Sequence, residues 1–292
     1  MTTSLTLVES DVQEEFFARG WTDGLPIIPP TPERINAMLN SANVKPDKVV
    51  GMVPERSRTI SAEKAAINAV MSGCEPKHFL VVLAAIDAMC DPDFGCNTVL
   101  TSTGGAALCV VISGPDLADL GFNSNRNALG PGYRANATVG RALRLIAMNV
   151  LGARSDYLDG SSLGHPGKYT MLVAEEVPPE AWDPLRVELG FNEDETTVTL
   201  LATEGPHQIS NQLNGTAEGI LSSLASAMTN PTTYGVGKGH QVLLVLGYEH
   251  RRILIEQGWT KRAIREYLVA TSRVSPSYLE SAGIVMEHTT QN

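Results

Sequence analysis

The chain has 292 residues, of which 43% are hydrophobic and only 18% are charged. Because an ordinary soluble domain carries about 25% charged residues, the polar surface is small and we expect contacts between the subunits of a homo-oligomer. The 32 acidic and 22 basic side chains give a formal net charge of −10, with no basic tract. This charge disfavours nucleic acid as a partner.

Neither a membrane anchor nor a secretory leader is predicted. The longest apolar run, 79–86, falls well short of the roughly 20 residues that a membrane-spanning helix needs. Residues 1–9 lack a basic patch followed by an apolar stretch, so we expect a cytoplasmic protein with no membrane partner. The four cysteines match neither a CxxC pair nor zinc-finger spacing, and a cytosol would keep them reduced.

In chain order, the first 45 residues are expected to form an arm. Apolar spacing predicts a helix over 8–19, and a threonine followed by proline opens a second helix over 32–39. The segment 20–32 between them is too rich in proline for a helix or a central strand. Its apolar residues indicate an ordered loop or lid that covers a pocket, with Trp21 and Asp23 as substrate-binding residues.

The segment 46–250 predicts an α/β core. Three stretches share one plan: a proline in a turn, polar and basic residues, a helix of small residues, and an apolar strand of the kind buried on both faces. The predicted strands are 107–113, 169–174 and 241–246. This pattern indicates either a weak internal repeat with pseudo-threefold symmetry or the plain alternation of elements in an α/β protein.

The chain closes with two predicted helices, 250–257 and 260–271, and a polar tail. The expected fold class is therefore α/β, as a single domain over 1–292. It combines an amino-terminal arm (1–45), the core and carboxy-terminal helices with their tail (251–292).

Four glycine-containing motifs stand out along the chain. They are GWTDGLP at 20–26, GPGYRANATVGRALR at 130–144, GHPGKY at 164–169 and GYEH at 247–250. Together they resemble an uncharacterised bacterial family associated with UGSC-type proteins, which carry cysteine or selenocysteine, and the resemblance spans nearly the whole chain. The resemblance implies an enzyme with a small substrate and allows a UGSC-type protein as partner. It does not indicate which reaction the enzyme catalyses. The tetrapeptide itself is absent, so a redox role would fall to the partner or to another cysteine.

The second motif predicts an anion site. A flexible turn over 130–132 precedes a helix whose free N–H groups and dipole, about half a positive charge, would face an anion beside Arg134 and Arg141. We expect Arg134 and Asn136 to bind substrate there. The alternative is that Arg134 caps a neighbouring helix or pairs with an acid. Neither GxGxxG after a strand nor GxxxxGK[ST] occurs, so no nucleotide cofactor is expected.

Acidic residues follow the predicted strands, and these strand ends would converge if the repeat is real. Glu175, Glu176, Glu249 and His250 are therefore the candidates for acid–base catalysis. Glu249 and His250 are also candidate ligands of a divalent metal, Mg or Mn with oxygen ligands and Zn or Fe with histidine. The alternative is that such acids cap the next helix.

Four further candidates lie in predicted turns and loops. His165 and His207 stand beside prolines in glycine-bearing turns, where an imidazole can face a pocket and act as a base, and Lys168 shares the turn of His165. Cys96 is placed in a loop, where a thiol of lowered pKa would be a nucleophile.

The function predicted from these residues is an enzyme that acts on a small polar or anionic metabolite, with a carboxylate as the expected anion, by lyase or hydrolase chemistry. Its cofactor stays unknown, with a divalent metal as the open choice. Two alternatives stay open: a thiol-dependent redox enzyme that uses Cys96 with a UGSC-type partner, and a non-catalytic subunit of a hetero-complex.

Overall fold

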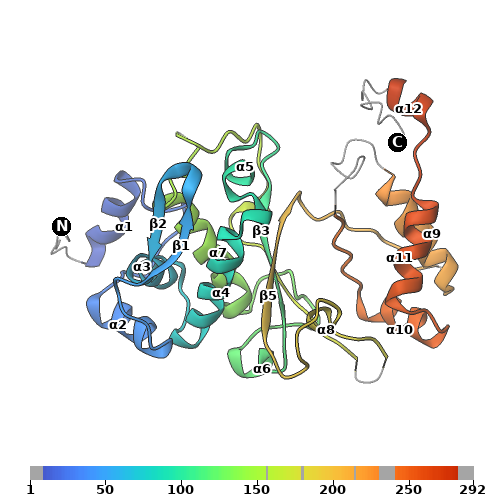
Figure 1. The fold of residues 1–292 in the computed structure, drawn as a ribbon, viewed down its shortest axis with the longest axis horizontal. Helices are drawn as coiled ribbons and strands as arrows, with labels where there is room; N and C mark the ends of the chain where they lie inside the picture. The colour runs from blue at the N-terminus through green and yellow to red at the C-terminus, as the bar shows by residue number, and fades with distance from the viewer. Residues whose placement is uncertain (1–8, 156, 179–180, 214, 230–240, 282–292) are drawn as a thin grey trace. The chain divides into compact units, whose positions relative to one another are not determined.

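The computed structural model describes residues 9–155, 157–178, 181–213, 215–229 and 241–281. Its contacts divide the chain into two compact units (Figure 1). Unit 1 comprises Met1–Val177 and Pro184–Pro206, and unit 2 comprises Pro178–Asp183 and His207–Asn292. The mixture of helices and strands confirms the predicted α/β class.

The helices and strands of unit 1 follow one another in a mixed order. They are α1 (Glu9–Ala18), α2 (Pro32–Ser41), β1 (Val49–Val53), β2 (Arg58–Ser61), α3 (Ala62–Ser72), α4 (Phe79–Cys90), α5 (Cys96–Thr101), β3 (Ala107–Ser113), α6 (Leu117–Leu120), α7 (Arg134–Asn149), β4 (Leu172–Ala174), α8 (Leu185–Glu188) and β5 (Thr197–Thr203). Short 3-10 turns at Pro54–Arg56, Pro76–His78, Pro92–Phe94 and Pro166–Lys168 each begin with a proline. The predicted helices of the arm and the loop between them are confirmed.

A three-stranded sheet in the order β4-β3-β5 forms the centre of unit 1. Strand β3 runs parallel to β4, with Val111 opposite Val173, and antiparallel to β5, with Val111 opposite Thr199. All seven residues of β3 are buried, as its continuous apolar sequence predicts. Helix α4 packs against β5 and helix α7 against β3 and β4, so the core lies between these helices and the sheet.

The prediction of three repeated helix-strand segments is wrong at its third strand. Residues 241–247 form neither helix nor strand, and α10 (Tyr248–Glu256) follows them directly. Leu244 and Leu246 instead pack against the helices of unit 2. The third strand of the sheet is β5, a threonine-rich segment whose pairing with β3 makes it a strand. The internal repeat therefore has no support in the described residues.

Unit 2 is built from helices α9 (Ala217–Met228), α10, α11 (Lys261–Thr271) and α12 (Pro276–Ser281). The first three share an apolar core that includes Leu221, Leu254 and Leu268. The two helices predicted after residue 250 are confirmed as α10 and α11. No helix among the described residues is long and apolar enough to cross a membrane.

Candidate functional site

The loop that carries the first motif is fastened to helix α7 by an ion pair. Arg141 donates from Nε to Oδ2 of Asp23 and from Nη2 to Oδ1, both at 2.8 Å, and Nη2 also donates to the carbonyl oxygen of Pro26 at 2.8 Å. The two side chains are 13% and 4% exposed. Such a two-pronged pair fixes both partners in orientation. The loop of 20–32 is therefore held on α7 as an ordered loop.

A second carboxylate, Asp159, gathers cations beside this pair. It accepts a hydrogen bond from Arg144 Nη2 at 2.7 Å and two from Lys168 Nζ at 2.8 and 3.0 Å, and Ser161 Oγ donates to it. Burial raises the pKa of Asp159, but the hydrogen bonds from Lys168, Ser161 and Arg144 outweigh burial and hold the pKa well below its usual range. Asp159 therefore stays ionised and keeps both cations in place.

Between the loop, the end of α1 and α7 lies a cavity of about 550 Å³, which we call the basic pocket. Its lining residues are Phe17, Ala18, Arg19, Gly20, Thr22, Asp23, Arg144, Met148, Arg154, Ser155, Lys168 and Tyr169. Four of these side chains are cationic and one is anionic. A pocket of this size with convergent polar groups is typical of a small-molecule site.

Arg144 has donors to offer a ligand. One of its nitrogens bonds Asp159, and Nε and Nη1 have no hydrogen-bond partner among the described residues. The side chain is only 14% exposed, so these donors are already oriented when a ligand arrives. Arg19 also lines the pocket, and its guanidinium pairs with Glu15 and stands 4.9 Å from the ring centre of Trp21.

Two residues predicted for the site lie in or near this pocket. Asp23 and Lys168 line it, although both are engaged with protein partners. Trp21 does not line it: its ring packs on Phe16 at 5.3 Å and the residue is 37% exposed. The structure therefore places Trp21 outside the pocket, not in it as the predicted substrate-binding residue.

Arg134 and Asn136 take structural roles at the start of α7. Arg134 donates to the carbonyl oxygen of Gly73, at the end of α3, and to Glu75. These contacts match the alternative expectation, in which Arg134 caps a neighbouring helix or pairs with an acidic residue. The buried Asn136 accepts from the backbone N–H of Asn123 and donates to its carbonyl oxygen, so it holds the loop before α7.

Of the two carboxylates of unit 1 expected for acid–base chemistry, Glu175 has a structural role. Glu175 accepts from Ser113 Oγ at 2.6 Å and from the backbone N–H of Leu185, at the first residue of α8. Glu176 is exposed.

In unit 2, Glu249 is exposed in the first turn of α10, and His250 Nε2 donates to the carbonyl oxygen of Asn211 at 2.7 Å. Residues 241–247 form no strand. Glu249 and His250 therefore do not follow a strand whose end would meet those of the other two predicted strands. Within the described part of the chain, no group of three or more His, Cys, Asp and Glu side chains is arranged to hold a metal ion.

Cys96 is not the loop nucleophile that the sequence suggested. It is the first residue of α5 and is 6% exposed. Burial, with a smaller effect of Cys90, raises the pKa of its thiol to about 12. The thiol is therefore protonated at neutral pH and a poor nucleophile.

The two turn histidines lie outside the basic pocket. His165 Nε2 donates to the carbonyl oxygen of Thr203 at 3.3 Å, and Nδ1 is buried with no hydrogen-bond partner among the described residues. His207 is exposed in unit 2. Among the described residues, neither imidazole is hydrogen-bonded to the cations of the site, and His165 meets Lys168 only through a backbone bond, in which the N–H of Lys168 donates to the carbonyl oxygen of His165.

Three of the four motifs behind the family resemblance meet at the basic pocket, because α7 holds the loop of the first motif and Asp159 joins Arg144 to Lys168 of the third. No family model, curated protein or solved structure matches the chain. The cationic pocket residues that the sequence did not single out as candidates are Arg19, Arg144 and Arg154. Arg144 had a local signal, because it follows Arg141 by three residues on one helix and so shares its face.

Proposed function

We propose that unit 1 binds a small anionic metabolite, a carboxylate or a phosphate ester, in the basic pocket. The observation that carries this proposal is the lining of four cations and one anion in a protein whose formal net charge is −10. A guanidinium binds such anions well because its N–H groups match the spacing of two oxygens.

The ligand contacts follow from the arrangement of the pocket. Arg144 offers Nε and Nη1 to one anionic group, and Asp159 holds the guanidinium so that little side-chain freedom is lost on binding. Thr22 and Ser155 add hydroxyl groups to the lining. The sequence resemblance implies an enzyme with a small substrate but gives no reaction class. Lyase or hydrolase chemistry was predicted from Glu175, Glu176, Glu249 and His250, which do not line this pocket, so the proposal here is the binding of the anion.

Thermal unfolding with a panel of anions tests the binding. The probes are inorganic phosphate, succinate and citrate at millimolar concentration and constant ionic strength. A ligand at a hundred times its Kd stabilises the folded state by about 2.7 kcal/mol, so at least one probe is expected to raise the Tm by several degrees. Titration calorimetry then gives the Kd.

Arg144→Ala is expected to abolish this shift, and Arg144→Lys, which keeps the charge but loses the planar fork, to weaken it. Arg262→Ala is the matched control, since Arg262 is an exposed arginine of α11 in unit 2. The proposal fails if no probe stabilises the protein, or if the shift is as large in Arg144→Ala as in the Arg262→Ala control.

A further inference from the structure

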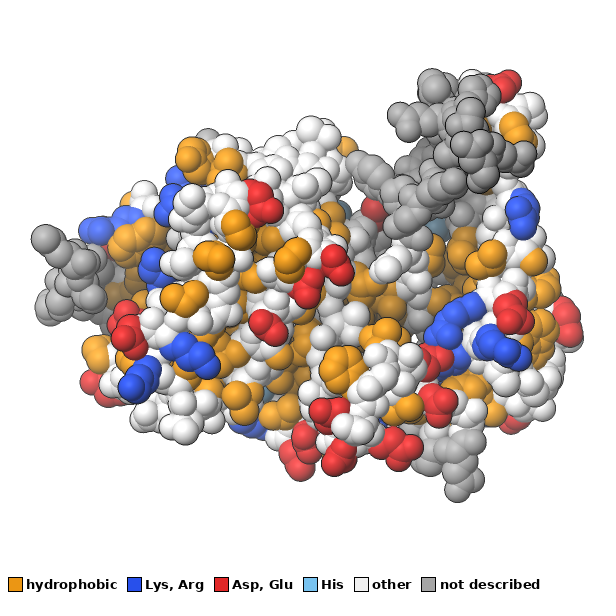
Figure 2. All heavy atoms as spheres, in the orientation of Figure 1, with side chains coloured by type: hydrophobic (Ala, Val, Ile, Leu, Met, Phe, Trp, Pro, Cys, Tyr) orange, Lys and Arg blue, Asp and Glu red, His pale blue; other side chains and the backbone are white. Residues whose placement is uncertain are grey.

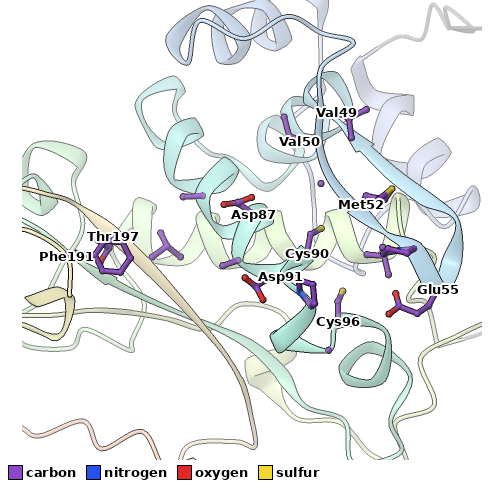
Figure 3. Close-up of a pocket in the computed structure, with 18 of the residues that line it drawn as sticks. Val49, Val50, Met52, Glu55, Asp87, Cys90, Asp91, Cys96, Phe191 and Thr197 are labelled. Atoms are coloured by element: carbon purple, nitrogen blue, oxygen red, sulfur yellow. The ribbon is translucent and has the colours of Figure 1, made fainter. Parts of the chain in front are cut away.

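A second hollow of unit 1, which we call the acidic groove, has a volume of about 960 Å³ and lies away from the residues of the basic pocket. Figure 3 shows part of its lining. The walls come from β1, the carboxyl-terminal half of α4, the turn into α5, and the segment that leads into β5. Its charged lining residues are Glu55, Asp87, Asp91 and Glu195.

No basic side chain is among the lining residues of this groove. None of the four carboxylates forms an ion pair within the described part of the chain: Asp91 and Glu195 accept hydrogen bonds from nearby Asp93 and Asn192, and Glu55 and Asp87 accept none. The groove therefore carries uncompensated negative charge. An occupant of complementary charge must be cationic.

The buried and exposed parts of the lining differ in character. Val53 and Cys96 are almost completely buried, whereas the four carboxylates are exposed, together with Val49 and Met52. In Figure 2, hydrophobic side chains lie over β1 and α4 with acidic side chains among them. An occupant that fits both parts has an apolar side toward the floor and a basic side toward the rim.

Two strand edges border the groove. Strand β1 pairs only with β2, and β5 only with β3, among the described residues. Helix α4 packs against both strands and lies between them in Figure 1. Gly51 lets β1 approach α4 closely, since a Cβ there would stand 2.7 Å from Ile86 Cγ2. Unpaired edges offer backbone N–H and C=O groups to an added strand.

We propose that the acidic groove binds an extended segment of a partner protein, in which Lys or Arg alternates with apolar residues, by strand addition to β1 or β5. Side chains alternate between the two faces of a strand, so one set meets the apolar floor and the other reaches the carboxylates of the rim. A small polyamine would meet the charge but leave the strand edges unpaired. A second copy of this acidic chain is disfavoured by charge.

The test begins with a phage library of random heptapeptides selected on the full-length protein. Counter-selection uses the double variant Asp87→Lys, Asp91→Lys, and a Tm measurement checks that this variant is folded. The milder Asp87→Asn, Asp91→Asn pair replaces it if it is not. Selected peptides are then synthesised with blocked ends and titrated by fluorescence anisotropy.

The selected peptides are expected to carry Lys or Arg alternating with apolar residues. They should bind the unaltered protein about ten-fold more tightly than the Asp87→Asn, Asp91→Asn variant. N-methylation at alternate amides, which removes the donors for strand pairing but keeps the charge, is expected to abolish binding. Asp119→Asn, a change of an exposed acid on α6, is the matched control and should bind like the unaltered protein.

Three results would overturn the proposal. They are survivors without basic residues, N-methylated peptides that bind as well as their parents, and a selection that yields no peptide dependent on Asp87 and Asp91. Spermine is titrated in parallel. If spermine binds with the same dependence on Asp87 and Asp91 while no peptide does, the groove belongs to a small cation.

Discussion

Asp23 and Arg141 show how single residues hold the candidate site together. The pair is almost fully buried, so each charge depends on the other for the interactions that water would otherwise provide. Arg141 also bonds the carbonyl oxygens of Leu25 and Pro26. Loss of one partner therefore affects both the ion pair and the path of the loop.

We expect Asp23→Ala to lower the free energy of unfolding by about 3 to 5 kcal/mol, because it leaves the Arg141 guanidinium buried without its anion. Urea denaturation followed by circular dichroism measures the change. The control is Glu15→Ala, which breaks the more exposed pair with Arg19 on α1 and should cost less than about 1 kcal/mol. Equal costs for the two variants would show that the Asp23 pair does not anchor the loop.

The thiols give a second prediction at this scale. Burial raises the pKa of Cys96 to about 12 and that of Cys109 to about 11, so at pH 8 only about one Cys96 in ten thousand is a thiolate. Iodoacetamide at pH 8, with mass spectrometry, should leave Cys96 unlabelled for hours in the folded protein and label it within minutes in urea. Rapid labelling of Cys96 in the folded protein would restore the thiol-dependent alternative.

At the scale of elements, His78 joins the start of α4 to α6. Its side chain is buried, Nδ1 accepts from the backbone N–H of Glu75 at 3.1 Å and Nε2 donates to the carbonyl oxygen of Leu120 at 2.9 Å. This pattern requires the neutral ring. Burial lowers the pKa of His78, while the bond to Leu120 and the charge of Glu75 oppose the shift.

Stability should therefore fall with acid. The unfolded chain takes up a proton on His78 near its ordinary pKa of about 6.5, before the folded chain does, so the stabilisation is present above that pH and is lost as the pH falls below it. The Tm measured from pH 8 to pH 5 should drop less steeply in His78→Gln than in the unaltered protein. His207→Gln, in an exposed position, should keep the original slope, and an unchanged slope in His78→Gln would refute the assignment.

Strand β5 and the segment 241–246 show why strands were harder to predict than helices. The apolar run of 241–246 has the composition of a buried strand, but no strand of unit 2 is present among the described residues to pair with it. In β5, threonines alternate with apolar residues, and its antiparallel register with β3 makes it a strand. Strand formation depends on a partner that is distant in sequence, which local composition does not reveal.

At the scale of the whole molecule, two hollows of opposite charge occupy unit 1. The basic pocket lies among the cations on α7 and in the segments near Arg154 and Lys168, and the acidic groove has only carboxylates as charged lining groups. The separation of charge allows one unit to take an anionic small molecule and a cationic peptide at different places. We keep a UGSC-type protein as the partner proposed from the sequence resemblance.

We also expect the chain to form a homo-oligomer, because charged residues are scarce and large apolar side chains are exposed, such as Leu163 and Val269 at 98% and 71%. Light scattering coupled to size-exclusion chromatography should give a mass that is a multiple of 31.3 kDa. The same measurement at low micromolar protein concentration tests whether the oligomer dissociates on dilution. A single monomeric species would contradict the expectation and favour the hetero-complex.

The sequence by itself determined the helices of the arm, the two helices after residue 250 and the central strand. Periodic apolar spacing and local caps settled α2, α10 and α11, and a continuous apolar run settled β3, because these signals depend on residues that are near in sequence. Part of the site was also visible, since Asp23 and Lys168 lie in motifs that the sequence singled out.

Only the tertiary structure decided what those residues do. The sequence singled out Arg134 and not Arg144 as a substrate-binding residue, but Arg134 caps α3, whereas Asp159 orients Arg144 beside the pocket. The sequence predicted Cys96 in a loop, but in the structure it is the first residue of α5 and its thiol is buried. Burial and long-range pairing set the charge state and availability of each group, and both depend on which distant segments pack together.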